Sequence, residues 1–207
     1  MRRTVEEAAV TKSDVVDAAL AVFAEYGYAA ATIGSIAGRA GVTRGAVYHH
    51  FAGKADLYTR ALEIRWDRVC GPIWAELDGA GPPLARLRAF GVAYLTAVEN
   101  DGRFRELLHV TLFGAEALPE LRQGLAAKER AMSTWVDTIA AVLTEARDAG
   151  ALRVGREPRA AALAFVGLLT GVTSAWLTAP EVCSPAASAG SLVDALLDGI
   201  ADAAGER

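Results

Sequence analysis

A three-residue link, Gly41-Val42-Thr43, joins two short segments of helical apolar periodicity and constrains the fold more than any other feature. The glycine can supply the positive φ that so sharp a turn needs, and the threonine hydroxyl can cap the following helix. Ile36 on the first segment would face Val47 and Phe51 on the second. Apolar contact between these faces would lock the two helices together, so the segment predicts a helix-turn-helix.

The opposite face of the second segment is polar and contains a small residue. It presents Arg44, Gly45, Tyr48 and His49, whereas His50 shares the apolar side and is expected to pack. Such a face suits a recognition helix, because donors reach base edges and phosphates while the backbone sits close to a groove. The alternatives are a solvated surface charge for Arg44 and partial burial for Tyr48.

The rest of the chain also predicts helices, since Ala, Leu, Arg and Glu dominate the periodic segments and no alternating strand pattern occurs. A first helix from Lys12 to Tyr26 has an apolar stripe ending at Tyr26, with Gly27 as a left-handed cap. The other expected helices are at 33–40, 44–51, from 54 onward, and at 84–99, 104–113, 120–149, 159–177 and 187–203.

These segments predict an all-α chain of about nine helices. Residues 1–55 are expected to form a three-helix DNA-binding domain with the helix-turn-helix, and residues 56–207 a larger helical body for ligand binding and dimerisation. Gly71-Pro72 interrupts the helix that begins near Lys54. Proline removes a backbone donor and disfavours helical geometry in the preceding residue, so a break or kink is expected there.

The sequence AALAVFAEYGYAAATIGSIAGRAGVTRGAVYHHFAGKADLY, residues 18–58, strongly resembles the DNA-binding region of the TetR family. The resemblance implies that Thr43 and Tyr48 hold phosphates and that Arg44 and His49 contact bases. It also implies phosphate contacts for Thr32 and Lys54, although a plain surface lysine is an equal alternative for Lys54.

The body more weakly resembles AcrR-type members of the family, repressors of multidrug efflux genes, in segments such as EARDAGALR and GLLTGVTSAWLTAPE. An apolar cavity with few polar groups is what a lipophilic effector needs. The candidate effector-binding residues are aromatic side chains and one histidine of the middle helices, and core packing is the alternative for each: Trp66, Phe90, Tyr94, His109, Phe113 and Trp135.

The last two helices are expected to form a two-fold interface with a second copy. Small residues would let the helices of two chains approach closely, and leucines would fill the contact. The expected interface residues are Ala164, Gly167, Gly171, Ala175, Leu192 and Leu196. Burial within one chain is the alternative. The uncharged run from Ala160 to Pro180 has the length of a membrane span, but its Thr, Ser, Ala and Gly favour a buried helix.

Other classes of protein find little support. The net charge of −4 is unusual for a nucleic-acid binder, but residues 1–60 carry seven Lys or Arg against six Asp or Glu. Only three histidines occur, and no metal-ligand spacing, nucleophile motif or phosphate loop is present, so neither a metal, a cofactor nor an enzyme activity is expected. Redox sensing through Cys70 and Cys183 is less favoured than inert burial.

The expected function is therefore a dimeric, ligand-responsive repressor in the cytoplasm, with no signal peptide. It would bind double-stranded operator DNA, control an efflux transporter gene and leave its operator when a lipophilic small molecule binds. The alternative is a regulator of the same family that controls metabolic or signalling genes and responds to a metabolite, acyl thioester or lactone.

Overall fold

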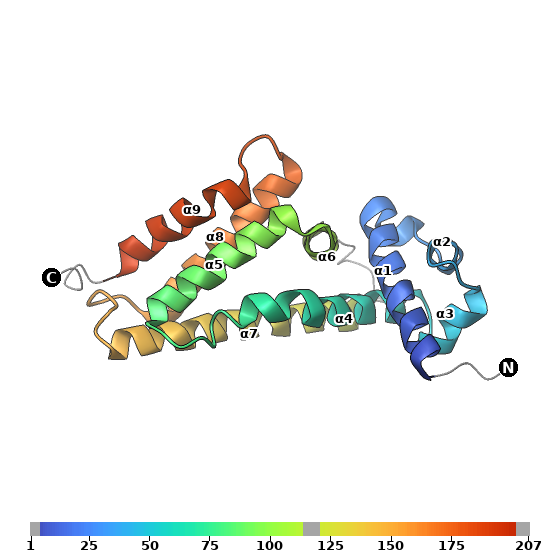
Figure 1. Cartoon of the computed structure of the whole chain (residues 1–207), viewed down its shortest axis with the longest axis horizontal. Coiled ribbons are helices and arrows are strands. Elements are labelled where there is room, and N and C mark those ends of the chain that lie inside the picture. The colour runs from blue at the N-terminus through green and yellow to red at the C-terminus, as the bar shows by residue number, and fades with distance from the viewer. Residues whose placement is uncertain (1–4, 114–120, 202–207) are drawn as a thin grey trace. The chain divides into compact units, whose positions relative to one another are not determined.

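The computed structural model describes residues 5–113 and 121–201, and within these ranges the chain forms nine helices and a single isolated bridge between Leu152 and Ala201 (Figure 1). The all-α prediction is confirmed. The helices are α1 (Val5–Ala30), α2 (Ile33–Arg39), α3 (Arg44–His50), α4 (Lys54–Trp74), α5 (Pro83–Asn100), α6 (Gly102–Phe113), α7 (Arg122–Asp148), α8 (Pro158–Thr178) and α9 (Pro185–Ile200). Two predicted helix ends, at 120 and at 202–203, lie outside the described residues.

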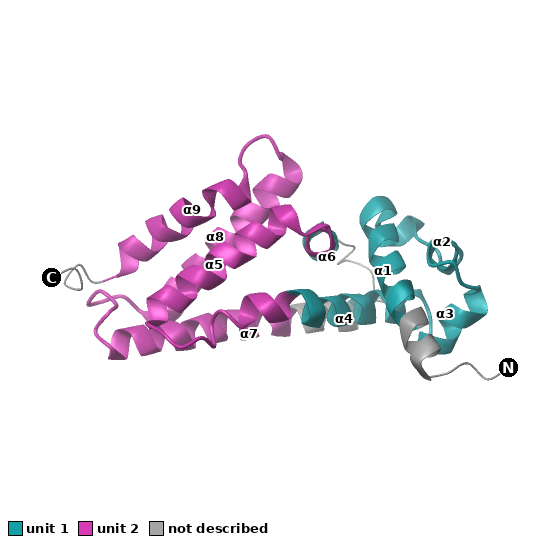
Figure 2. Cartoon of the chain, viewed as in Figure 1, with its two compact units in different colours: residues 1–69, 106–127 teal, residues 70–105, 128–207 magenta. Residues whose placement is uncertain are grey.

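The chain divides into two compact units (Figure 2). Unit 1 comprises residues 1–69 and 106–127, and unit 2 comprises residues 70–105 and 128–207. The boundary predicted at residue 55 falls inside unit 1, where Leu57 and Tyr58 of α4 belong to the buried core. The Arg65 guanidinium of α4 also donates to the Asp17 carboxylate of α1 at 2.6 Å, and this arginine is 2% exposed.

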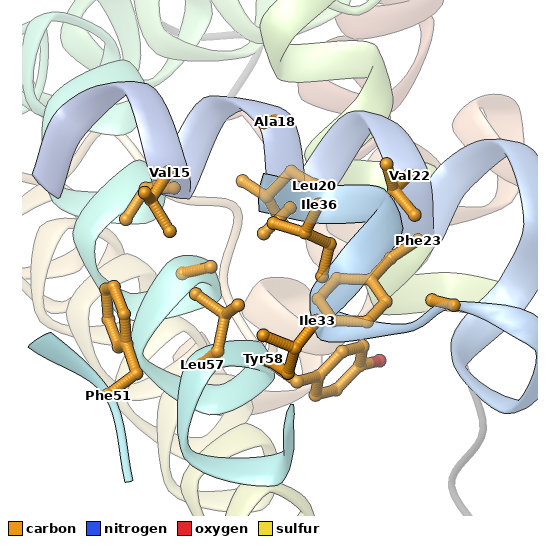
Figure 3. Close-up of a cluster of buried hydrophobic side chains, with 14 of the residues drawn as sticks. Val15, Ala18, Leu20, Val22, Phe23, Ile33, Ile36, Phe51, Leu57 and Tyr58 are labelled. Carbon is orange, nitrogen blue, oxygen red and sulfur yellow. The ribbon is translucent and has the colours of Figure 1, made fainter. Parts of the chain in front are cut away.

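The core of unit 1 joins α1, α2, α3 and the start of α4 (Figure 3). Leu20 of α1, Ile36 of α2 and Val47 of α3 are each fully buried, and Phe51 is 2% exposed. The predicted contact between the two helices of the helix-turn-helix is therefore made through a shared core. The rings of Phe23 and Tyr58 meet edge to face, with centroids 5.0 Å apart.

Gly27 ends the regular part of α1, but not with the predicted geometry. Its φ of 73° is positive, as expected, whereas its ψ of 165° is extended rather than left-handed helical. Tyr26, predicted to close the buried stripe, is 57% exposed, and Tyr28 is buried instead at 4%. The prediction for Tyr26 was wrong because the chain changes direction at the glycine, so the tyrosine beyond it turns inward.

The expected break at Gly71-Pro72 is also wrong, because α4 continues through Pro72 to Trp74. The alternative of a kink at this point stays a prediction. The clash that keeps a residue before proline out of the helical region involves its Cβ, and Gly71 has none. The Gly71 carbonyl still accepts from the Ala75 amide at 3.0 Å. Three tighter turns follow the helix, closed by the amides of Glu76, Leu77 and Asp78.

Unit 2 is built around α5, which packs against α8 and α9. Gly91 of α5 allows this close approach, since a Cβ there would lie 2.8 Å from Val193 Cγ2 and 2.9 Å from Phe165 Cζ. Arg88 of α5 adds a two-point ion pair with Asp194 of α9, at 2.6 and 2.9 Å. These contacts make α5 the central helix of the unit.

By length and composition alone, α8 could cross a membrane. A core helix of a soluble protein passes the same test, and Phe165, Leu169 and Trp176 on one side of α8 are buried within unit 2. Only 39% of its most apolar stretch is buried inside the chain. The helix therefore has one packed face and one uncovered face.

Gly91→Ala should lower the free energy of unfolding by about 1–3 kcal/mol, because the added methyl overpacks the contact between α5 and the two helices beside it. Gly199→Ala in α9 is the matched control, since its Cβ would meet nothing within 4 Å. The control should be neutral or stabilising by up to about 1 kcal/mol. Urea denaturation of the full chain measures both, and equal effects would contradict the packing argument.

Candidate DNA-binding surface

Two threonines cap the two helices of the helix-turn-helix. The Thr32 hydroxyl accepts from the Ser35 amide at 3.0 Å while the Ser35 hydroxyl accepts from the Thr32 amide at 3.1 Å, a reciprocal capping box at the start of α2. Thr43 caps α3 in the predicted way, accepting from the Ala46 amide at 3.2 Å. Gly41 has the expected positive φ, 66°. Local hydrogen bonds thus determine where α3 begins.

The outward face of α3 is uncovered in the single chain. Arg44, Gly45 and His49 are exposed, and Tyr48 is 56% exposed. His50 is half-buried, with its ring against His49 and Phe51 at centroid distances of 5.1 and 6.3 Å. The predicted separation of an apolar inner face from a polar outer face is present.

Thr32 lies beside this face rather than apart from it. A Cβ placed on Gly34 would be 3.6 Å from Thr32 Oγ1 and 4.0 Å from Arg44 Nε. The hydroxyl that opens α2 and the arginine that opens α3 therefore border the same small gap.

Lys54 has partners inside unit 1 that the sequence did not reveal. Its ammonium donates to the carbonyl oxygens of Tyr28, Ala29 and Ala31 at 2.9, 3.4 and 3.1 Å, and lies 4.3 Å from the centroid of the Tyr28 ring. An ammonium has three donors, and all three are engaged here. These contacts differ from the predicted phosphate contact: in this arrangement Lys54 joins the start of α4 to the end of α1.

The six predicted effector residues are divided between the two units. Trp66, His109 and Phe113 belong to unit 1, where the last two rings lie 5.3 Å apart and Phe113 is 50% exposed. Phe90, Tyr94 and Trp135 belong to unit 2 and are 1%, 3% and 5% exposed.

The three predicted effector residues of unit 2 are part of a larger cluster of rings. Trp74, Phe104 and Phe165 complete it, and neighbouring centroids are 5.0 to 6.5 Å apart. The sequence shows these three aromatic residues, but no spacing pattern singles them out, because they come from three different helices. Burial raises the pKa of the Tyr94 hydroxyl, an effect that its hydrogen bond with Thr173 partly offsets, so the phenol stays neutral.

The predicted interface residues lie on the uncovered side of the last two helices. Ala164, Gly167, Gly171 and Ala175 of α8 are exposed, and Leu192 and Leu196 of α9 are half-buried. Leu163 is 56% exposed on the same helix and was missed by the sequence argument, although it precedes Ala164 directly. Val193 and Leu197, by contrast, are buried inside unit 2.

Two family models match the chain. Residues 15–61 match that of the bacterial regulatory proteins of the tetR family, and residues 82–201 match the C-terminal region of MAATS-type transcriptional repressors. The first match spans the helix-turn-helix with the preceding helix, and the second spans α5 to α9.

Known proteins resemble the chain over most of its length. It is 30% identical to the HTH-type transcriptional regulator AcrR of Shigella flexneri over 182 residues, which is 87% of this chain and 84% of that protein. NalD, the secondary repressor of the MexAB-OprM multidrug efflux pump in Pseudomonas aeruginosa, aligns with a TM-score of 0.81 at 25% identity, over 93% of this chain and 96% of NalD.

A third similar protein has been solved with a small molecule bound. SmeT, the repressor of the Stenotrophomonas maltophilia multidrug efflux pump SmeDEF, aligns in its triclosan complex with a TM-score of 0.81 at 29% identity. The alignment covers 93% of this chain and 92% of SmeT.

Lys54→Met keeps the side-chain stem but removes the ammonium, and should lower the free energy of unfolding by about 1–3 kcal/mol because three carbonyl groups lose a charged donor. Arg60→Met on the same helix is the control, since its ion pair with Asp56 is exposed and should contribute less than about 1 kcal/mol. Chemical denaturation compares the two. Unchanged stability with reduced DNA affinity would instead assign Lys54 to a phosphate.

Proposed function

The chain belongs to the TetR family of bacterial transcriptional regulators, and we propose that it represses an efflux transporter gene and releases its operator when a neutral lipophilic molecule binds. The observation that carries the DNA-binding part is the exposed face of α3, held by a buried inner face and a capped start. NalD and SmeT are repressors of multidrug efflux pumps, which supports the choice of target gene.

On the DNA side, the residues divide by chemistry. Arg44 can donate two parallel bonds to a guanine edge, and His49 can reach an adjacent base. Thr32, Thr43 and Tyr48 supply hydroxyls to phosphates, which fix the register of the helix but carry no sequence information. Gly45 lets the α3 backbone approach the groove, and Lys54 supports the surface by joining α4 to the end of α1.

The active form is a homodimer that uses the uncovered faces of α8 and α9. Two recognition helices related by a two-fold axis can then contact two half-sites about one DNA turn, or a multiple of it, apart. The small residues of α8 allow close approach of a second copy, while Leu163, Leu192 and Leu196 supply apolar area.

The effector site lies in the helical body, and a cytoplasmic location follows from the role. SmeT was solved in complex with triclosan. In this chain, the uncharged rings of unit 2 would suit a neutral lipophilic molecule. The sequence alternatives were a metabolite, an acyl thioester or a lactone. Of these, an anionic metabolite or acyl thioester fits the cluster less well, because the six rings carry no charge.

The direct test is titration of the purified chain against the DNA upstream of its own gene, with scrambled competitor, at two salt concentrations. Footprinted binding that weakens steeply with salt is expected, since phosphate contacts release counterions. Triclosan and related compounds are then added to the complex, and DNA release is expected. Binding that is equal on scrambled DNA would contradict sequence-specific repression.

Arg44→Ala should cost about 1–3 kcal/mol on the cognate site and relax the preference for it over scrambled DNA. Arg39→Ala is the control: it removes an arginine at the end of α2 whose guanidinium is paired with Glu25 at 2.7 Å. Electrophoretic mobility shift assays on the cognate site and on scrambled DNA measure the ratio of the two affinities for each variant. If discrimination stays intact in the Arg44 variant, this arginine is not a base-reading residue.

Ala164→Arg places a long charged side chain on the uncovered face of α8 and should convert the dimer to a monomer at micromolar concentration. Ala141→Arg makes the same change at an exposed alanine of α7 and should leave the dimer intact. Light scattering after size exclusion gives the mass of each. A dimer that survives the change at Ala164 would place the interface on other helices.

A further inference from the structure

One buried polar atom in the aromatic cluster of unit 2 has no partner. The indole Nε1 of Trp135 has no hydrogen-bond acceptor among the residues that the structure describes, although the side chain is only 5% exposed. Buried indole N–H groups in proteins usually have an acceptor, because an unsatisfied donor loses its bonds to water without replacement. This atom is therefore in a costly state within the single chain.

The neighbouring polar group in the same cluster is satisfied. The Thr173 hydroxyl donates to the Leu169 carbonyl at 2.7 Å and is also the hydrogen-bond partner of the Tyr94 hydroxyl. The ring centroids of Tyr94 and Trp135 are 5.5 Å apart. Two polar groups in the same surroundings therefore differ, because one has a hydrogen-bond partner and the other has none. Within this cluster of rings, Trp135 Nε1 is therefore the unpaired donor.

The surroundings restrict what could pair with it. Trp135 meets Trp74 edge to face at 6.2 Å, and Trp74 lies against Phe90 at 5.0 Å. Trp74 stands in the last turn of α4 and is the one half-buried ring of the six, so it lies between the buried rings and solvent. Uncharged rings cannot compensate a buried charge, but they suit apolar and aromatic surface.

We propose that the effector carries a neutral hydrogen-bond acceptor, such as a ketone, ester or ether oxygen on an aromatic body, and that this oxygen accepts from Trp135 Nε1. The inference rests on the proposed function and specifies its ligand. The site would prefer a neutral compound with a hydrogen-bond acceptor over a pure hydrocarbon of the same shape. Trp135 thus acts as a specificity-determining residue, since a site built to pair a donor discriminates against ligands that lack the partner.

The test uses two probes of matched shape, benzophenone and diphenylmethane, which differ by a carbonyl in place of a methylene. Calorimetry on the DNA-free full chain gives both affinities, and Trp135→Phe removes the donor while keeping an aromatic ring. The ratio of the two affinities should fall by about three- to tenfold in this variant, in line with one neutral hydrogen bond. Trp176→Phe, at another buried tryptophan of unit 2, is the control and should leave the ratio unchanged.

A second measurement does not depend on how the Trp135→Phe variant folds. The native chain has four tryptophans, and their indole N–H groups give separate signals in nitrogen-labelled protein. Benzophenone should shift one signal downfield, diphenylmethane should not, and replacing Trp66, Trp74 and Trp176 in turn assigns the shifted signal by elimination. A shift at another tryptophan overturns the proposal.

The outcomes separate this inference from the proposed function. An affinity ratio that is equal in the native chain and in Trp135→Phe overturns the inference, as does failure of benzophenone to bind. Neither result affects operator binding, which is measured separately on DNA. Loss of specific operator binding would instead count against the proposed function, while the coupling between the carbonyl and Trp135 could still be measured.

Discussion

The candidate DNA-binding surface depends on the burial of Val47 against Ile36 and Phe51. The helix α3 has seven residues, too few to be stable alone, and Val47 is the only one of them that is buried. The free energy that orients α3 therefore comes from this contact with unit 1, together with the Thr43 cap. The polar face of α3 is free for another molecule because the opposite face supplies all the attachment.

Much of unit 1 could be predicted because its determinants are local. Gly41 and Thr43 have the predicted backbone and cap, since a turn of three residues leaves few alternatives. The two wrong predictions for unit 1 and α4 arose where a neighbouring glycine changed the expected backbone geometry. Pro72 did not break α4 because it follows a glycine, and Tyr26 left the core because the chain turns at Gly27.

The candidate effector site was harder to predict, because membership depends on contacts between distant segments. The effector set predicted from the sequence included Phe90, Tyr94 and Trp135 but left out Trp74 and Phe165, which lie in the same cluster. No periodicity within a helix reports which helices will meet. Nor does any sequence pattern show that Tyr94 finds a partner in Thr173 while Trp135 does not; that distinction appears only when side chains are placed.

The helix α8 has two faces of different composition. For this reason the sequence alone did not decide whether it crosses a membrane, packs in the core or forms an interface. Its large apolar residues, Phe165, Leu169 and Trp176, pack within unit 2, whereas Gly167 and Gly171 face outward. Large apolar side chains stabilise a helix that faces lipid, whereas glycine and alanine contribute little because they offer little apolar area. Small residues on an uncovered face contribute to stability only where they let another backbone approach closely. The distribution of side-chain size around α8, rather than its mean hydropathy, therefore favours a second protein chain as the partner of this face.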